Sequence, residues 1–264
     1  MINGETDRMN RSGNVGYKAP AVQKAFGLLK LVAESNRGLG TSELAKCLGF
    51  SKSTTHGLIQ ALVKTGALSE SPQRKTYFLG PAIVDLAFKS RNYFRVGEKA
   101  QPVIEELRDR IGETIFLGVL SRSHGIIVAT AEASNPLNIS SSPGTTVPLL
   151  AGAVGKIFLA GFSDDQVLDI IGEKGLPQFT AHSIVSEAAY LTELSRVRKL
   201  GYALDNEEYL PGVKAVAVGL GNLRGLPLAL WAVGFAGTMT QDKMPGIIKK
   251  IHAASERLKQ LLDA

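Results

Sequence analysis

The first third of the chain alternates between helical apolar patterns and short breaks. Apolar side chains recur every three or four positions from Ala21 to Ser35, which predicts an amphipathic helix. Thr41 and Ser51 are typical helix N-caps, so two further helices are expected, ending near Gly49 and Thr65.

Two short strand-like runs, 67–71 and 76–80, follow these three helices. The residues that separate them include Arg74 and Lys75, so a β-hairpin with a basic tip is expected. Three helices and a hairpin predict a winged helix-turn-helix domain over residues 19–80. Residues 1–18 are polar and predict a flexible tail, and residues 81–98 are expected to form a linker helix.

The rest of the chain, residues 99–264, is predicted to be a second domain with helices at its start and end. An opening helix from Phe94 to Ile111 and a closing helix from Gln241 to Leu262 have one apolar face each. Two more helices are expected at 164–171 and 187–200, and strands at 114–120, 125–132, 137–142, 201–205, 213–220 and 227–235. This pattern predicts an α+β fold whose C-terminal domain contains an antiparallel sheet.

Charge divides the chain in the same place as the apolar pattern. Residues 1–90 carry 12 Lys and Arg but only 6 Asp and Glu, whereas residues 91–264 carry 18 of each sign. The whole formal charge of +6 therefore lies in the first third. A basic module attached to a neutral domain is typical of a protein that binds a polyanion through one part only.

The third predicted helix has the polar residues that a DNA recognition helix uses. Leu58, Ile59 and Leu62 point to one side of it, and the opposite side is polar. Side chains with donors and acceptors near the helix N-terminus read base edges, and a basic hairpin tip reaches phosphate. The candidate DNA-binding residues are Lys52, Ser53, Thr54, His56, Gln60, Arg74 and Lys75. The same face could also be a solvated surface of a structural helix.

Several classes of function lack support in the sequence. The longest uncharged apolar run, residues 226–236, is too short for a membrane span, and residues 1–18 have no secretory core. The four histidines have no metal-binding spacing, the lone Cys47 is expected to be buried, and no nucleophile elbow is present. Two of the three acidic residues Asp205, Glu207 and Glu208 are interpreted as facing solvent or fixing the local loop rather than as acid–base catalysts. We expect a cytoplasmic protein that is not an enzyme and uses no cofactor, metal or membrane.

At this point the order of residues resembles one bacterial family. The segments VQKAFGLLKLVAESNRGLGTSELAKCLGFSKSTTHGLIQALVKTGALSESPQRKTYFLG, GETIFLGVL, VPLLAGAVGKIFLAG and GYALDNEEYLPGVKAVAVGL resemble IclR-type transcription regulators, and the likeness covers residues 19–262. It implies a DNA-binding head, a linker helix and a GAF-like effector-binding and oligomerisation domain. It also implies a homodimer or homotetramer that binds double-stranded DNA at a palindromic operator and responds to a small organic effector of a catabolic operon.

Departures from the family pattern bear on both expected sites. Gly57 stands where the family commonly has Arg, and Thr55 where it has Val. In the effector domain, the resemblance carries the pocket over to Leu150, Ala153, Val154, Asp205, Ala215, Ala232 and Gly234. Family members commonly have Cys at the position of Ala215, and those that bind small carboxylates have Ser at the positions of Ala232 and Gly234. The absence of this thiol and these two hydroxyls favours a roomier, more apolar pocket for an aromatic or longer-chain organic acid.

Two alternatives remain open at this stage. One is an enzyme that carries the winged helix as an accessory domain. The other is a winged helix that contacts only other proteins, which would leave the exposed polar face and the basic hairpin tip unexplained.

Overall fold

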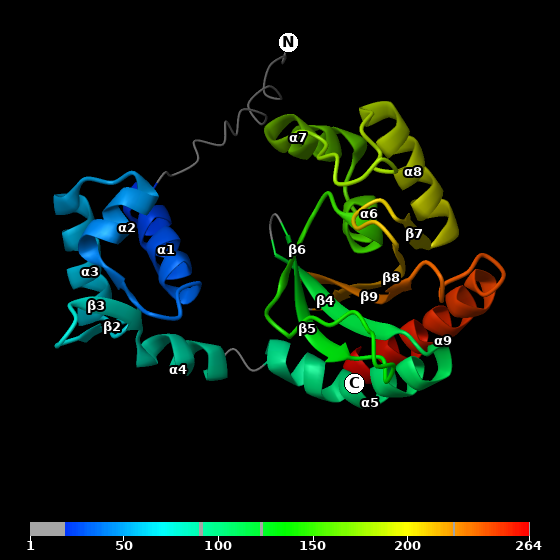
Figure 1. The fold of residues 1–264 in the computed structure, drawn as a ribbon, viewed down its shortest axis with the longest axis horizontal. Helices are drawn as coiled ribbons and strands as arrows, with labels where there is room; N and C mark the ends of the chain where they lie inside the picture. Colours follow the sequence, from blue (N-terminus) through cyan, green and yellow to red (C-terminus); the bar gives the residue numbers. More distant parts are fainter. Residues whose placement is uncertain (1–18, 90–91, 122–123, 224, 264) are drawn as a thin grey trace, which may run out of the picture. The chain divides into compact units, whose positions relative to one another are not determined.

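The computed structural model describes residues 19–89, 92–121, 124–223 and 225–263. The chain divides into two compact units, residues 1–91 and 92–264, which are described separately (Figure 1). The segment predicted as one linker helix, 81–98, is shared between them, because α4 (Pro81–Lys89) belongs to the first unit and α5 (Asn92–Ile111) to the second. The predicted tail, residues 1–18, lies outside the described residues.

The first unit is a winged helix-turn-helix. Its elements are α1 (Pro20–Ala33), β1 (Leu39–Gly40), α2 (Thr41–Leu48), α3 (Lys52–Lys64), β2 (Leu68–Ser71), β3 (Thr76–Leu79) and α4. The strands form an antiparallel sheet in the order β1-β3-β2, so the predicted hairpin gains a third, very short strand. Leu28, Leu44, Ile59 and Leu68 are almost completely buried and join the helices to the hairpin.

Two local predictions in this unit need correction. Gly40 rather than Thr41 is the N-cap of α2, and its N–H donates to the Glu43 carboxylate over 3.0 Å. Cys47, which the apolar pattern placed inside, is exposed. The two turns of α2 bury only Leu44 and Ala45, so the apolar stripe of this helix is narrower than its sequence indicates.

The second unit is an antiparallel sheet with helices on both faces. Its strands are β4 (Thr114–Ser121), β5 (His124–Ala131), β6 (Thr146–Pro148), β7 (Tyr202–Asn206), β8 (Val213–Leu223) and β9 (Leu226–Phe235), in the order β6-β5-β4-β9-β8-β7. Its helices are α5, α6 (Gly152–Ala160), α7 (Asp164–Lys174), α8 (Glu187–Leu200) and α9 (Met244–Asp263). Helices α5 and α9 pack on one face, and α6 packs on the other beside α8 (Figure 1).

The strand predicted at 137–142 is not formed. Asn138 donates instead from its side-chain amide to the carbonyl of Ala133 over 2.8 Å, a local bond that holds this segment as a loop. The edge strand beside β5 is β6, which follows the turn and pairs with β5. In the described residues, every helix is too short or too polar to span a lipid bilayer.

Candidate DNA interface and effector site

Helix α3 is anchored through one side and capped at its start. The Ser51 hydroxyl accepts from the Thr54 N–H over 3.1 Å, which satisfies one of the free amides of the first turn. Thr55 is completely buried and donates from its hydroxyl to the carbonyl of Ser51 over 3.0 Å. Because Thr55 and Ile59 fix the inner side of α3, its outer side is held toward solvent.

All seven candidate DNA-binding residues are exposed. Lys52, Ser53, Thr54, His56 and Gln60 lie on α3, and Arg74 and Lys75 lie at the tip between β2 and β3. Of the ion pairs found within the described residues, none uses Lys52, Arg74 or Lys75. Their positive charges are not neutralised by neighbours, so they are available to an anionic partner. The outer side of α3 has open space at Gly57, where an added Cβ would meet no heavy atom within 4 Å.

The structure brings five of the seven predicted effector residues to one face of the large sheet. Leu150, Ala153 and Val154 lie at the start of α6 and pack in the core on this face, as does Ala215. Asp205 lies opposite Ala215 in the β7–β8 ladder. Its carboxylate lies so close to Gly152 that a Cβ there would be only 2.7 Å from Oδ2, and Gly152 has a φ of 59°, so a residue without a side chain is needed at this point.

Ala232 and Gly234 do not belong to this group. Side chains alternate along β9, and Ala232 packs in the core that α5 and α9 cover. A Cβ at Gly234 would collide with the Glu113 carboxylate on that same side. Trp231 and Val233, which each come one position earlier, are among the residues of β9 that pack on the α6 side. Trp231 packs 5.5 Å from the Phe116 ring, so this part of the face is filled by aromatic rings.

A hollow opens between the start of α6, the segment 177–184 and α8. The roughly 260 Å³ of empty space at this point includes open solvent, and the enclosed part has room for about one water molecule. Leu150, Phe179 and Ile184 give it an apolar wall, and Lys156, Tyr190 and Glu208 give it polar groups. Of the predicted pocket residues only Leu150 lines it, so most of the hollow is formed by residues that sequence reasoning did not find.

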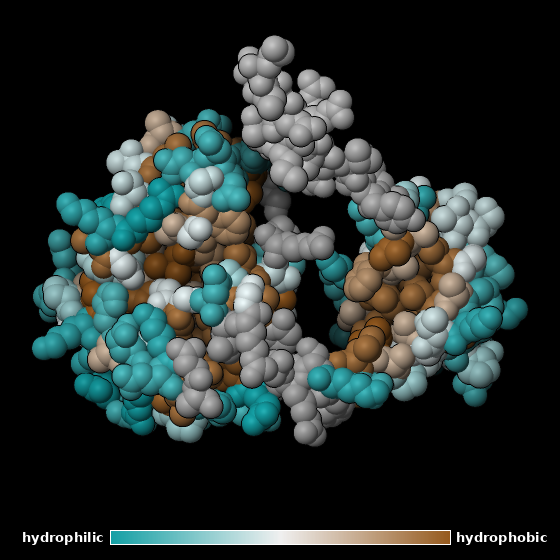
Figure 2. Space-filling model, turned by 180° about the vertical axis from the view of Figure 1, so that it is seen from behind, coloured by the Kyte–Doolittle hydropathy of each residue, from teal (hydrophilic) through white to brown (hydrophobic). Residues whose placement is uncertain are grey.

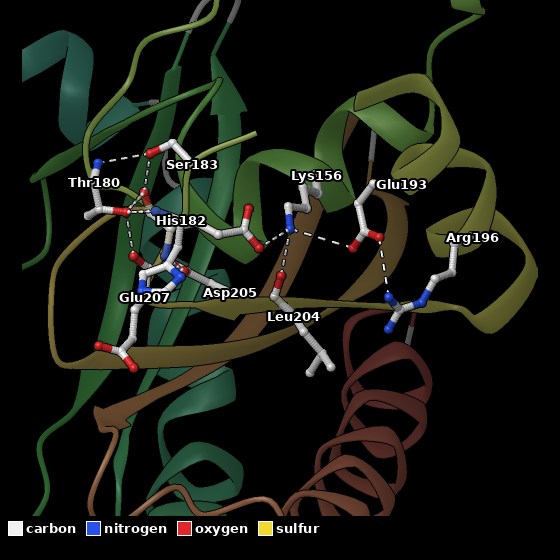
Figure 3. A network of polar contacts seen from close by, with 10 residues as sticks. Lys156, Thr180, His182, Ser183, Glu193, Arg196, Leu204, Asp205 and Glu207 are labelled. Atoms are coloured by element: carbon white, nitrogen blue, oxygen red, sulfur yellow. Dashed lines mark hydrogen bonds and ion pairs between the residues drawn. The ribbon is translucent and has the colours of Figure 1, made fainter. Parts of the chain in front are cut away.

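Lys156 is the centre of a buried charge network (Figure 3). It is only 2% exposed, and its ammonium group donates to the carbonyl of Leu204 over 2.8 Å and to Glu208 Oε1 over 2.6 Å. Glu193 Oε1 lies 3.5 Å away on the other side, and Oε2 of the same carboxylate pairs with Arg196 over 3.4 Å. The one sequence signal for this site is a lysine inside the apolar run VPLLAGAVGKIFLAG.

The acidic turn after β7 connects this network to the segment 177–184. Asp205 accepts from the Glu208 N–H over 2.7 Å, and Glu207 accepts from the Gly212 N–H over 2.9 Å, so both carboxylates fix the turn as predicted. Thr180 and Ser183 donate from their hydroxyls to the carbonyls of Glu207 and Glu208, at 2.7 and 2.8 Å (Figure 3). Burial raises the pKa of the Asp205 carboxyl to about 6.

Two family descriptions match this chain and together cover most of it. The IclR helix-turn-helix domain matches residues 21–72, and the C-terminal domain of the bacterial transcriptional regulator IclR matches residues 90–260. The chain belongs to the IclR family. The first match contains α1, α2 and α3, and the second contains the sheet, the hollow and the Lys156 network.

Individual IclR-family proteins agree with this assignment. The HTH-type transcriptional regulator XynR of Escherichia coli is 31% identical over 207 residues, which is 76% of this chain and 80% of XynR. A crystal structure of an IclR transcriptional regulator from Alicyclobacillus acidocaldarius is 26% identical, covers 93% of this chain and 100% of its own, and has a TM-score of 0.75. An IclR homologue from Microbacterium hydrocarbonoxydans, solved with 4-hydroxybenzoate, is 17% identical, covers 92% of this chain and 99% of its own, and has a TM-score of 0.72.

The IclR assignment makes the protein a DNA-binding transcription regulator with a C-terminal ligand-binding domain rather than an enzyme. No group of three or more metal-binding side chains comes together in the part of the chain that the structure describes.

Proposed function

We propose that this IclR-family protein is a cytoplasmic regulator of a catabolic operon that binds a palindromic operator as a homodimer or homotetramer. Its effector is an aromatic or longer-chain organic acid. The observation that carries the DNA part is the outer side of α3, where exposed donors and acceptors lie beside cations without ion-pair partners among the described residues. A recognition helix with this arrangement reads bases in the major groove while the hairpin tip contacts the backbone.

A gel-shift series with promoter fragments at rising salt concentration tests this assignment. Affinity should fall steeply with salt, because phosphate contacts release counterions. His56→Ala and Gln60→Ala should relax the preference between operator and unrelated DNA, whereas Lys75→Ala should weaken both about equally. If neither the protein nor its isolated head retards any promoter fragment at low salt, the proposal is wrong and a role in protein contacts is favoured.

The effector class is supported by the wall of the hollow. Leu150, Phe179 and Ile184 offer an apolar surface beside polar groups, and the hollow, whose enclosed part has room for about one water molecule, widens when an organic ligand enters. The Microbacterium homologue supplies a natural first probe, 4-hydroxybenzoate. Calorimetric titration should give tighter binding of 4-hydroxybenzoate than of glyoxylate or pyruvate, and the opposite order would contradict the effector class.

Contact between two copies through the first unit, in addition to the oligomerisation expected of the second, is supported by the apolar surface of the first unit. Val22 and Phe26 on α1 and Val84 and Leu86 on α4 are each more than half exposed. Figure 2 shows apolar residues gathered on one side of this smaller unit. A second copy of the chain would bury the same apolar residues from both partners, as a two-fold interface does.

A further inference from the structure

Tyr190 has a hydroxyl group that the folded protein does not use. The residue is 4% exposed, lines the hollow, and its hydroxyl oxygen has no hydrogen-bond partner among the residues that the structure describes. Buried hydroxyls are nearly always satisfied, because an unpaired one loses its bonds to water without replacement. Phenylalanine at this position would pack α8 equally well. The hydroxyl is therefore available to form a hydrogen bond with a ligand that enters the hollow.

Near Tyr190, the ammonium group of Lys156 has a carboxylate partner that an anionic ligand can replace. Its closest anionic partner, Glu208, also lines the hollow, and the Glu208 side chain is 17% exposed, about as much as the 16% of Glu193. Its second partner, Glu193, is held by Arg196 as well and does not line the hollow. Of the two carboxylates, Glu208 is the one that can leave while Lys156 keeps a counter-ion.

We propose that the effector's carboxylate accepts a hydrogen bond from the Tyr190 hydroxyl and replaces Glu208 as the partner of Lys156. This inference rests on the proposed function, since it takes the effector to be an organic acid, and it assigns the atoms that recognise the acid group. A neutral ligand is rejected because it would leave the buried ammonium short of negative charge once Glu208 had moved.

The exchange also gives the site a way to transmit binding. The backbone of Glu207 and Glu208 holds the segment 177–184 through the hydroxyls of Thr180 and Ser183. When Glu208 leaves Lys156, the turn loses its side-chain anchor on α6, and the segment that walls the hollow is free to move with it. Binding is thereby converted into a change of backbone position at the mouth of the site.

Two single substitutions in the full-length protein test the proposal by calorimetric titration with 4-hydroxybenzoate. Tyr190→Phe should weaken binding about tenfold or more, the cost of one hydrogen bond to a charged group. Its melting temperature should be unchanged or higher, because the lost hydroxyl was unpaired. Glu208→Gln should tighten binding, since the neutral side chain competes less well for Lys156. Tyr202→Phe is the matched control, because Tyr202 packs with the core on the other face of the sheet and should leave affinity unchanged.

The neutral isostere 4-hydroxybenzamide completes the experiment. It should bind at least about a hundredfold more weakly than the acid to the wild-type protein. Equal affinity of wild type and Tyr190→Phe, weaker binding to Glu208→Gln, or equal binding of acid and amide would each overturn the inference while the effector class stands. If the wild-type protein binds no carboxylate at all, the effector class and this inference fall together, and the gel-shift result on DNA binding is unaffected.

Discussion

The two units use lysine in opposite ways. Lys75 stands exposed at the tip of the hairpin without an ion-pair partner among the described residues, whereas Lys156 is enclosed by two carboxylates and a backbone carbonyl. An exposed charge costs little to keep and acts through its field on any nearby polyanion. A buried charge is stable only with partners, so it responds only to a ligand that can replace one of them.

The contrast between an exposed and a buried lysine indicates what each unit can recognise. The winged helix offers many weak and independent contacts, which suit a long regular polymer whose phosphates repeat. The sheet domain offers one enclosed position, at Lys156, where the loss or exchange of a single charge changes the stability and the ligand affinity strongly. The same substitution should therefore change the free energy of unfolding very differently in the two units.

The largest contrast is expected from changing lysine to methionine in each unit. Lys156→Met leaves Glu208 and Glu193 beside an apolar side chain and should lower the free energy of unfolding by about 3–5 kcal/mol. Lys75→Met should change it by less than about 0.5 kcal/mol, as surface substitutions do. Urea unfolding followed by circular dichroism measures both.

The double variant Lys156→Met/Glu208→Gln checks the cause of this loss. Removing the main unpaired carboxylate should recover a large part of the stability. If the single and double variants unfold at the same urea concentration, packing rather than charge explains the effect of Lys156.

A second contrast concerns pH and the Asp205 carboxyl. Because its pKa is about 6 in the folded protein and about 3.8 in an unfolded chain, the folded state binds more protons between these values. This group therefore makes the protein less stable as the pH rises from about 4 to 6, by about 2–3 kcal/mol in all, and adds no further change above that. Asp205→Asn removes this dependence, so its stability relative to wild type should increase over that window, as thermal melts at pH 4, 5, 6 and 8 would show.

A parallel stability difference at all four pH values would contradict this origin. Glu113 also has a raised pKa through burial, but it is present in both proteins and cancels in the comparison. Exposed carboxylates such as Glu43 cancel in the same way.

The limits of sequence reasoning follow the same division between local and distant contacts. The cap at Ser51, the inner position of Thr55 and the ladders of β8 and β9 were predictable, because each is set by neighbours in the chain or by strict alternation. Alternation says which residues of β9 share a face but not which face that is, so Ala232 and Gly234 were assigned to the wrong side. The Lys156 network joins residues 37 to 52 positions apart, so the local pattern signals the lysine but not its partners.

The third contrast separates apolar residues that bind a second copy from those that only face solvent. Phe26→Asp places a charge within the exposed apolar residues of α1 and should raise the dimer dissociation constant at least about tenfold. Leu137→Asp is the matched control, because Leu137 is even more exposed but lies in the second unit. Analytical ultracentrifugation over a range of concentrations distinguishes them, and equal effects of both variants would argue against the first unit as the interface.

The smallest expected effect lies at Gly57, in the middle of the recognition helix. Its surroundings are open, so Gly57→Ala should stabilise the protein by about 1 kcal/mol through helix propensity alone, without changing DNA affinity. Gly57→Arg gains the same propensity and adds a cation on the outer side of α3, so it should also tighten binding and steepen the dependence on salt by about one phosphate contact. Thermal melts and gel shifts on the two variants separate the backbone contribution from the charge. If Gly57→Arg gains stability but no affinity for any DNA, the outer side of α3 does not face the duplex, and the distinction between an open, charged reading surface and an enclosed sensor has to be redrawn.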